Sequence, residues 1–254
     1  EMPSNSPEFQ SKTLGRFVFG TTSWLPLQMW EKNKDYIVDE ELLIGRETIV
    51  AFDLSEVSDF TAYTLYFAVD DNKYYGKHRF YISQATLQEK YKKDNINILG
   101  WIQQGYITVI PGETISYDFV FKDIVEDSKK YNIKEIVYDK WKSNPLTDML
   151  EKEFYHIPII KYDQGLKYFS DPTKLFEKAV KDEQIVDNNP VMPWMIGNVI
   201  IKPDANNNYK PLKNFKSSTD RIDGVITSIM AFDRFKQNEN KICDYSLDNI
   251  LASI

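Results

Sequence analysis

The sequence predicts a mixed α/β fold, in which one sheet combines antiparallel and parallel strands and carries helices on both faces. Three β-rich segments follow one another with short connections, which is typical of an antiparallel meander. Short apolar segments then alternate with helical patterns, the order that crossovers between parallel strands require. Because 42% of the 254 residues are hydrophobic, the chain can bury one sizeable core.

The meander begins where the run ETIVAFDLS (47–55) reads as an apolar strand. The segment TAYTLYFAVD (61–70) is β-rich and alternates in polarity, as a second strand would. The dipeptide DN at 71–72 predicts a tight turn, and KYYGKHRFYIS (73–83) continues as the third strand.

The rest of the chain alternates between helical and β patterns. Helices are expected at 84–105, with a break near 94–97, and at 114–131, 144–154, 171–183 and 218–235. Further strands are expected at 106–112, at 133–139 with its end at Asp139, and at 156–162, and a hairpin around an Asn-rich turn at 198–215. Thr114 is a plausible N-cap, Asn144-Pro145 is a helix start, and Asp171 should cap a helix with Pro172 at its first position.

The pattern predicts three parts. Residues 1–45 are turn-rich and mixed in charge, so we expect a connector that docks on a neighbouring domain. Residues 46–236 form the α/β domain, and residues 237–254 form a polar C-terminal tail. No apolar run approaches the roughly 20 residues of a membrane span, so we expect no membrane partner.

Composition disfavours several classes of site. The single cysteine, Cys243, excludes an internal disulfide framework and a multi-cysteine zinc site. His78 and His156 are far apart in sequence, which disfavours a histidine-based triad and the HExxH zinc motif. No GxxxxGK[ST] phosphate loop is present. The net charge of −7 argues weakly against nonspecific polyanion binding, although basic residues can cluster locally.

Three carboxylates fall where this topology could bring them together. Asp53 ends the first strand and Asp139 ends the run EIVYD, so parallel neighbours would place both at the edge where such sheets bind ligands. Asp223 opens the last helix, just before Gly224, whose missing side chain would let the helix press on the sheet. Taken singly, each Asp could instead cap a turn or complement a helix dipole.

Three carboxylates in one cleft repel one another unless they are protonated or neutralised by cations. Hard oxygen ligands with open water positions suit Mg²⁺ or Mn²⁺. Two such ions can activate a water and stabilise a leaving oxygen in phosphodiester hydrolysis, which requires no histidine.

The motifs resemble a known family. FDLSEVSDFTAYTLYF resembles the first motif of the C-terminal nuclease domain of phage large terminase subunits, which has the RNase H-like fold. IVYDKW resembles its middle motif, and NPVMPWMIGNVIIKPDANNNYKPLK and RIDGVITSIMAFDRF resemble its closing block. The resemblance runs from about residue 47 to residue 235 and implies a metal-dependent endonuclease that cuts concatemeric double-stranded DNA during packaging.

The resemblance also implies roles and partners. Asp53 would bridge two ions of Mg²⁺ or Mn²⁺, with Asp139 holding one and Asp223 the other. Residues 1–45 would be the connector from an ATPase motor domain, which is absent here. Double-stranded phage DNA, the portal protein and the small terminase subunit would be partners, in the cytoplasm of the infected bacterial host.

Two roles are open for several other residues. Asp59 could be a further metal ligand or cap the next strand, and Asp220 could be an outer ligand or weaken DNA attraction. A group of basic residues lies in or near the predicted hairpin at 198–215, here called the closing hairpin, and could contact DNA phosphates or form a solvated surface. It comprises Lys202, Lys210, Lys213, Lys216 and Arg221. Alternative functions are another RNase H-like enzyme, such as a Holliday-junction resolvase or a transposase, and a catalytically silent docking module.

Overall fold

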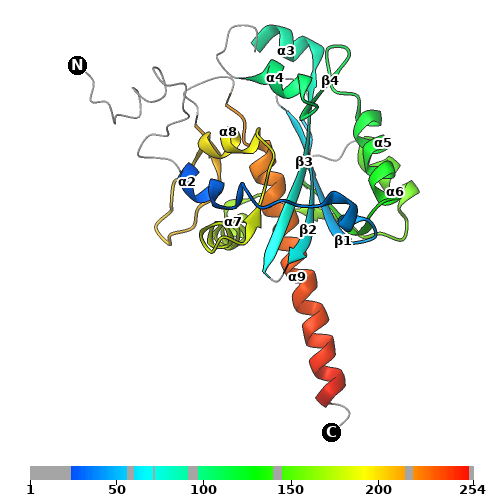
Figure 1. Cartoon of the computed structure of the whole chain (residues 1–254), viewed down its shortest axis with the longest axis vertical. Coiled ribbons are helices and arrows are strands. Elements are labelled where there is room, and N and C mark those ends of the chain that lie inside the picture. Colours follow the sequence, from blue (N-terminus) through cyan, green and yellow to red (C-terminus); the bar gives the residue numbers. More distant parts are fainter. Residues whose placement is uncertain are drawn as a thin grey trace, which may run out of the picture.

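The computed structural model describes residues 24–55, 60–70, 72–90, 97–139, 145–214 and 220–251. Its centre is a seven-stranded sheet in the order β4-β3-β2-β1-β5-β6, with β7 paired to β3 (Figure 1). The strands are β1 (Glu47–Asp53), β2 (Thr61–Asp70), β3 (Lys73–Ser83), β4 (Ile107–Ile110), β5 (Asn132–Asp139), β6 (Ile159–Tyr162) and β7 (Ile185–Val186).

The pairing confirms the predicted mixed sheet. Strands β1, β2 and β3 form the antiparallel meander. The pairs β1–β5, β5–β6, β3–β4 and β3–β7 are parallel. As a result, β1 has an antiparallel neighbour on one side and a parallel neighbour on the other.

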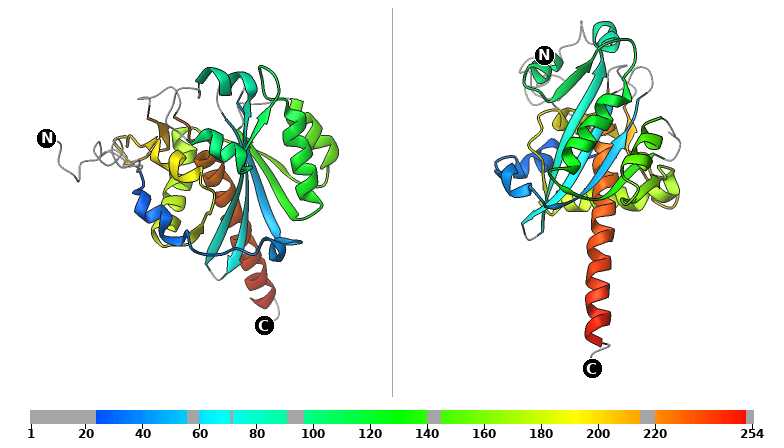
Figure 2. Two further views of the ribbon diagram at one scale, coloured as in Figure 1. Left: turned by 45° about the horizontal axis from the view of Figure 1, so that its top comes forward. Right: turned by 90° about the vertical axis from the view of Figure 1, so that its right-hand side faces the viewer.

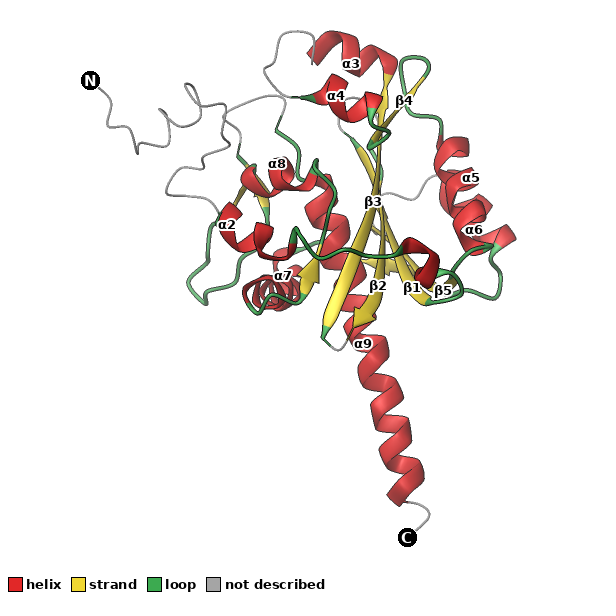
Figure 3. Ribbon diagram, in the orientation of Figure 1, coloured by secondary structure: helices red, strands yellow, loops and turns green. Residues whose placement is uncertain are grey.

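Helices cover both faces of the sheet (Figures 2 and 3). One face carries α2 (Leu27–Trp30), α7 (Leu166–Lys181), α8 (Met192–Gly197) and α9 (Asp223–Leu251). The other carries α5 (Tyr117–Ser128) and α6 (Pro145–Glu153). Helices α3 (Gln84–Lys90) and α4 (Ile98–Gln103) connect β3 to β4. None of these described helices combines the length and the apolar character that a bilayer span would need.

Two cores fill the space between sheet and helices, because side chains alternate along each strand. Ile49, Ala51 and Val137 belong to the core under α9, here called the α9-side core. Val50 and Phe52 belong to the core under α5, the α5-side core. Both faces of β1 are therefore buried, which explains its continuous apolar run.

Helix α9 differs from the prediction at its end. The expected helix stopped at residue 235 and left a polar tail, whereas α9 continues to Leu251 and projects beyond the body of the domain (Figure 1). Residues 236–251 contain neither Gly nor Pro, so nothing in that stretch ends the helix.

Two helix starts were also predicted wrongly. Helix α5 begins at Tyr117 after Ser116, not after Thr114. Helix α7 begins at Leu166, so Pro172 lies inside it and Asp171 is not its cap. The apolar stripe of α7 already includes Phe169, seven residues before Phe176, and burial of both phenylalanines extends the helix upstream of Pro172.

The described part of the N-terminal segment packs on the domain. It contains α2 and two 3₁₀ turns, η1 (Glu31–Asn33) and η2 (Glu40–Leu43). Trp24 and Trp30 are both buried, and each packs against Phe176 of α7, with ring centroids 6.5 and 6.3 Å apart. Residues 24–30 thus share the α9-side core.

Candidate active site

Asp53 and Asp139 end neighbouring parallel strands. The β1–β5 register pairs Phe52 with Tyr138, so one further step along each strand brings Asp53 beside Asp139. On their other sides, Asp53 pairs with Ala62 of β2, and Asp139 pairs with Tyr162 of β6.

Both side chains occupy positions that face α9. Ala51 and Val137 belong to the α9-side core, and Asp53 and Asp139 follow them by two residues in their strands. A strand places residues i and i+2 on one face, so both carboxylates continue the α9-facing rows. Asp53 is only 8% exposed, and burying a carboxylate is expensive unless it is paired or bound.

Two contacts show which way α9 runs across the sheet. Thr227 lies 2.6 Å from Thr64 (Oγ1 to Oγ1), and Thr64 pairs with Ala51. Further along the helix, Arg234 donates to both carboxylate oxygens of Glu135, at 2.7 Å each. Because Glu135 pairs with Ile49, nearer the start of β1, the helix runs antiparallel to β1. Its first residue, Asp223, therefore lies toward the Asp53 end.

A tyrosine beside this edge is tied to the same helix. Tyr162, the partner of Asp139 in β6, donates a hydrogen bond of 2.5 Å to Asp233 of α9. Burial raises the pKa of the Tyr162 hydroxyl, and the Asp233 carboxylate raises it further, so the hydroxyl stays a neutral donor. Burial likewise raises the pKa of Asp233.

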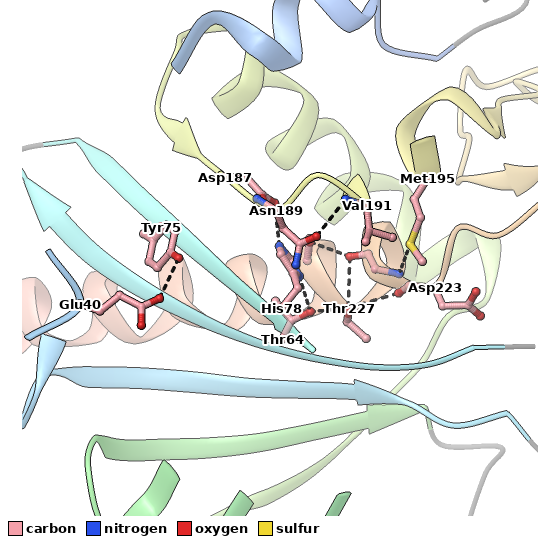
Figure 4. A network of polar contacts seen from close by, with 12 residues as sticks. Glu40, Thr64, Tyr75, His78, Asp187, Asn189, Val191, Met195, Asp223 and Thr227 are labelled. Atoms are coloured by element: carbon pink, nitrogen blue, oxygen red, sulfur yellow. Dashed lines mark hydrogen bonds and ion pairs between the residues drawn. The ribbon is translucent and has the colours of Figure 1, made fainter. Parts of the chain in front are cut away.

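The start of α9 is packed closely from two directions. Asp223 is 6% exposed, and its carboxylate points away from the polar network beneath the helix (Figure 4). A Cβ on Gly224 would lie 2.7 Å from the sulfur of Met192, 2.8 Å from the ring of Phe80 and 2.9 Å from the sulfur of Met195. This close packing confirms the expected role of Gly224.

The residues fit a divalent cation by donor type, but the described structure holds no closed cage for one. Within the part of the chain that is described, no group of three or more His, Cys, Asp or Glu side chains lies close enough to hold a metal ion. Asp59 falls outside the described residues. Asp220 is partly exposed, and its backbone carbonyl accepts a hydrogen bond of 2.8 Å from Arg221.

The basic residues do not share one environment. The predicted hairpin exists as β8 (Val199–Ile200) and β9 (Leu212–Lys213), with Lys202 exposed in its loop. The ammonium of Lys210 donates to the carbonyl of Gln164, 2.8 Å away and two residues beyond Tyr162. Lys213 is partly exposed in β9. Lys216 falls outside the described residues.

Arg221 requires a correction. Its side chain is among the largest fully buried ones, with the residue 2% exposed, and it donates to the backbone of Asp220. A guanidinium in this position cannot reach a phosphate at the protein surface. Charge and proximity to Asp223 suggested contact with DNA, but burial gives Arg221 a place inside the fold.

A buried histidine–aspartate contact on the α9 side of the sheet was not predicted from the sequence. His78 Nε2 lies 2.7 Å from Asp187 Oδ2, and both side chains are almost fully buried. The one signal for this contact in the sequence was His78 itself, a polar residue within a predicted strand. Nothing in the sequence marked Asp187.

Comparison with known proteins places the chain in a family. A family model described as the terminase large subunit, endonuclease domain, matches residues 3–239. The large terminase subunit of Enterobacteria phage HK97 is 24% identical, over 91% of this chain and 45% of that protein. Protein YmfN of Escherichia coli K12 is 27% identical, over 93% of this chain and 54% of that protein. The chain thus spans about half the length of these curated relatives.

Solved structures agree on the fold. The crystal structure of the HK97 large terminase superposes with a TM-score of 0.71 at 23% identity, covering 90% of this chain and 47% of that one. The large terminase nuclease of thermophilic phage G20c with bound magnesium gives a TM-score of 0.51 at 9% identity, covering 84% and 98%. The RNase H-like fold is therefore confirmed, and the chain belongs to the endonuclease domain family of terminase large subunits.

Proposed function

We propose that this chain is the metal-dependent endonuclease domain of a phage DNA-packaging terminase, and that it hydrolyses phosphodiester bonds of concatemeric double-stranded DNA. The observation that carries the proposal is the adjacency of Asp53 and Asp139 on the face where Asp223 opens α9. The bound magnesium in the G20c nuclease, a protein of the same fold, supports use of a divalent cation.

Asp53 would contact both ions, while Asp139 and Asp223 would each hold one. Asp59 or Asp220 would serve as a further ligand. Two bound Mg²⁺ or Mn²⁺ ions would supply an activated water and stabilise the leaving oxygen. The fold would hold these ligands on a rigid framework, because two of the three end paired strands and the third begins a helix packed on those strands.

The DNA would approach over the closing hairpin. Lys202, Lys210, Lys213 and Lys216 would neutralise phosphates, a contact that gives affinity without reading sequence. Lys210 lies near the candidate site, since Gln164, its partner, follows the strand that flanks Asp139. An ATPase motor, a portal protein and a small terminase subunit would be the further partners, in the cytoplasm of the infected host.

Plasmid cleavage tests the function. Wild type should nick and linearise supercoiled plasmid with Mn²⁺ or Mg²⁺ and lose the activity with EDTA. Asp53→Asn, Asp139→Asn and Asp223→Asn should each be inactive, whereas Asp182→Asn removes an exposed carboxylate at the end of α7 and should cut normally. If all variants cut the plasmid as well as wild type does, the assignment of the three aspartates as catalytic residues would be wrong.

Two other outcomes would favour the alternatives. A preference for four-way junctions over plain duplex, or strand transfer in place of hydrolysis, would indicate a resolvase or a transposase. A wild type that neither cuts DNA nor binds Mn²⁺ in calorimetry would indicate a silent docking module.

A further inference from the structure

Two arms of polar contacts run from one buried carboxylate, Asp187, to the first turn of α9, and together they form a ring (Figure 4). Asp187 lies between β7 and α8, and both of its oxygens are engaged. Oδ2 lies 2.7 Å from His78 Nε2, and Oδ1 accepts a hydrogen bond of 2.9 Å from the backbone nitrogen of Asn189. One side chain thus begins two arms of the ring.

The first arm passes through the sheet to the carbonyl side of the helix turn. His78 Nδ1 of β3 lies 2.9 Å from the hydroxyl of Thr64 in β2. The Thr64 hydroxyl lies 2.6 Å from that of Thr227 in α9. The Thr227 hydroxyl in turn lies 3.2 Å from the carbonyl oxygen of Asp223 and 3.1 Å from that of Gly224.

The second arm passes through α8 to the amide side of the same turn. The side-chain oxygen of Asn189 accepts from the backbone nitrogen of Val191 at 2.9 Å. The carbonyl of Val191 accepts from the nitrogen of Met195 at 3.2 Å. The sulfur of Met195 then accepts from the nitrogen of Gly224, also at 3.2 Å. Both arms therefore end on Asp223 and Gly224.

Each hydroxyl has one proton to donate, so the arm is continuous as far as the carbonyls of Asp223 and Gly224 only when both ring nitrogens of His78 donate. Nε2 then donates to Asp187 and Nδ1 to Thr64, while Thr64 donates to Thr227 and Thr227 to the carbonyls. A carboxylate that holds one ring nitrogen fixes the orientation of the imidazole. His78 also stacks on Phe80, with the rings 6° from parallel, and Phe80 is one of the groups that touch Gly224.

We propose that Asp187 is a positioning residue for Asp223, and that it acts through His78 and Thr64 on one side and through Asn189 and Met195 on the other. The inference rests on the proposed function, in which Asp223 binds a metal ion. Partners outside the ligand shell orient the ligands, and losing one lowers metal affinity by about 10- to 100-fold. The two carboxylate oxygens of Asp187 contact His78 and Asn189, so it would act on Asp223 through these residues.

The variants separate positioning from folding. Asp187→Asn keeps the shape but removes the carboxylate. If the amide oxygen still accepts from Asn189, the amide NH2 must donate to His78 Nε2, which reverses that hydrogen bond and moves the ring proton to Nδ1. Thr64→Val removes the hydroxyl of a fully buried residue, and Thr64→Ser retains it. Asp127→Asn is the matched control, because Asp127 is also buried but accepts from Tyr63 and Arg79 in the α5-side layer, away from α9.

The test is Mn²⁺ affinity by calorimetry together with the melting temperature of the metal-free protein, for these variants and Asp223→Asn. Asp187→Asn and Thr64→Val should raise the Mn²⁺ dissociation constant about 10-fold or more. Thr64→Ser should restore near wild-type affinity, and Asp127→Asn should lower the melting temperature without changing affinity. Wild-type affinity in folded Asp187→Asn and Thr64→Val, while Asp223→Asn loses binding, would overturn the positioning role alone. Unchanged binding in Asp223→Asn would overturn the metal assignment, and the positioning role with it.

Discussion

The backbone nitrogen of Gly224 lies 3.2 Å from the sulfur of Met195, so the first turn of α9 and the end of α8 leave no room for a side chain. Gly224→Ala should destabilise the domain by about 1–3 kcal/mol, because the new methyl group would overlap Met192, Phe80 and Met195. Urea unfolding measures the change. Gly→Ala at an uncrowded helical position stabilises by roughly 0.5–1 kcal/mol, and a gain of that sign would contradict the packing.

Arg234 and Glu135 join α9 to β5 through two hydrogen bonds of 2.7 Å each. The side chain of Glu135 is 7% exposed and that of Arg234 is 17% exposed, so this bidentate pair is largely removed from water. Glu135→Ala should lower the free energy of unfolding by roughly 3 kcal/mol, because it leaves the guanidinium without its carboxylate.

A surface pair serves as the control for that prediction. Lys178 and Asp182 lie 2.7 Å apart, but their side chains are 74% and 45% exposed. Asp182→Ala should change the free energy of unfolding by less than about 1 kcal/mol, since exposed pairs contribute little. Equal losses in the two variants would show that burial does not decide the strength of these pairs.

Glu177 links the N-terminal segment and the closing hairpin to α7, and this link should depend on pH. Burial alone would raise the pKa of Glu177, but hydrogen bonds from Lys181, Tyr209 and Trp24 together lower it below its usual 4.5. Burial and the hydrogen bond to Glu177 raise the pKa of Tyr209 to about 12, so its hydroxyl remains a donor throughout.

A lowered carboxyl pKa in the folded state adds stability above the unfolded pKa and loses it as pH falls through the folded value. The free energy of unfolding of wild type should therefore exceed that of Glu177→Gln by about 1–3 kcal/mol at pH 7, and this difference should shrink as pH falls below 4.5. Urea unfolding at several pH values tests this sign. A difference that grows on acidification would contradict it.

Divalent ions should stabilise the folded domain, because the proposed ligands come from the sheet and from α9 and are brought to one edge only by folding. At a Mn²⁺ concentration about 100 times the dissociation constant, the gain should be roughly 2.7 kcal/mol. The melting temperature should rise with Mn²⁺ and return after EDTA. Asp53→Asn should show a much smaller rise, and an equal rise would place the bound ion elsewhere.

The strands could be predicted because their signals are local. The apolar run of β1, the alternation of β2 and the turn at 71–72 are visible in the sequence, and the meander follows from their order. Asp53 and Asp139 could be predicted as strand ends for the same reason. Their side-by-side register depends on the pairing of Phe52 with Tyr138, which no local signal sets.

The elements missed or misplaced depend on tertiary contacts. Pro172 is a strong local start signal, yet burial of Phe169 carries α7 upstream of it. Arg221 was taken for a surface cation because its charge is local, whereas its burial is a property of the fold. Asp187 lies in a short connection without a motif. Asn189 is a local partner, but only the packing of β3 beside this connection supplies the other partner, His78.

The central claim is that Asp53, Asp139 and Asp223 hold divalent ions together. Anomalous diffraction from a crystal soaked in Mn²⁺ tests it most directly. We predict two peaks about 4 Å apart, with Asp53 contacting both, Asp139 contacting one and Asp223 the other. Peaks located away from these three carboxylates, or no peak at saturating Mn²⁺, would contradict the assignment.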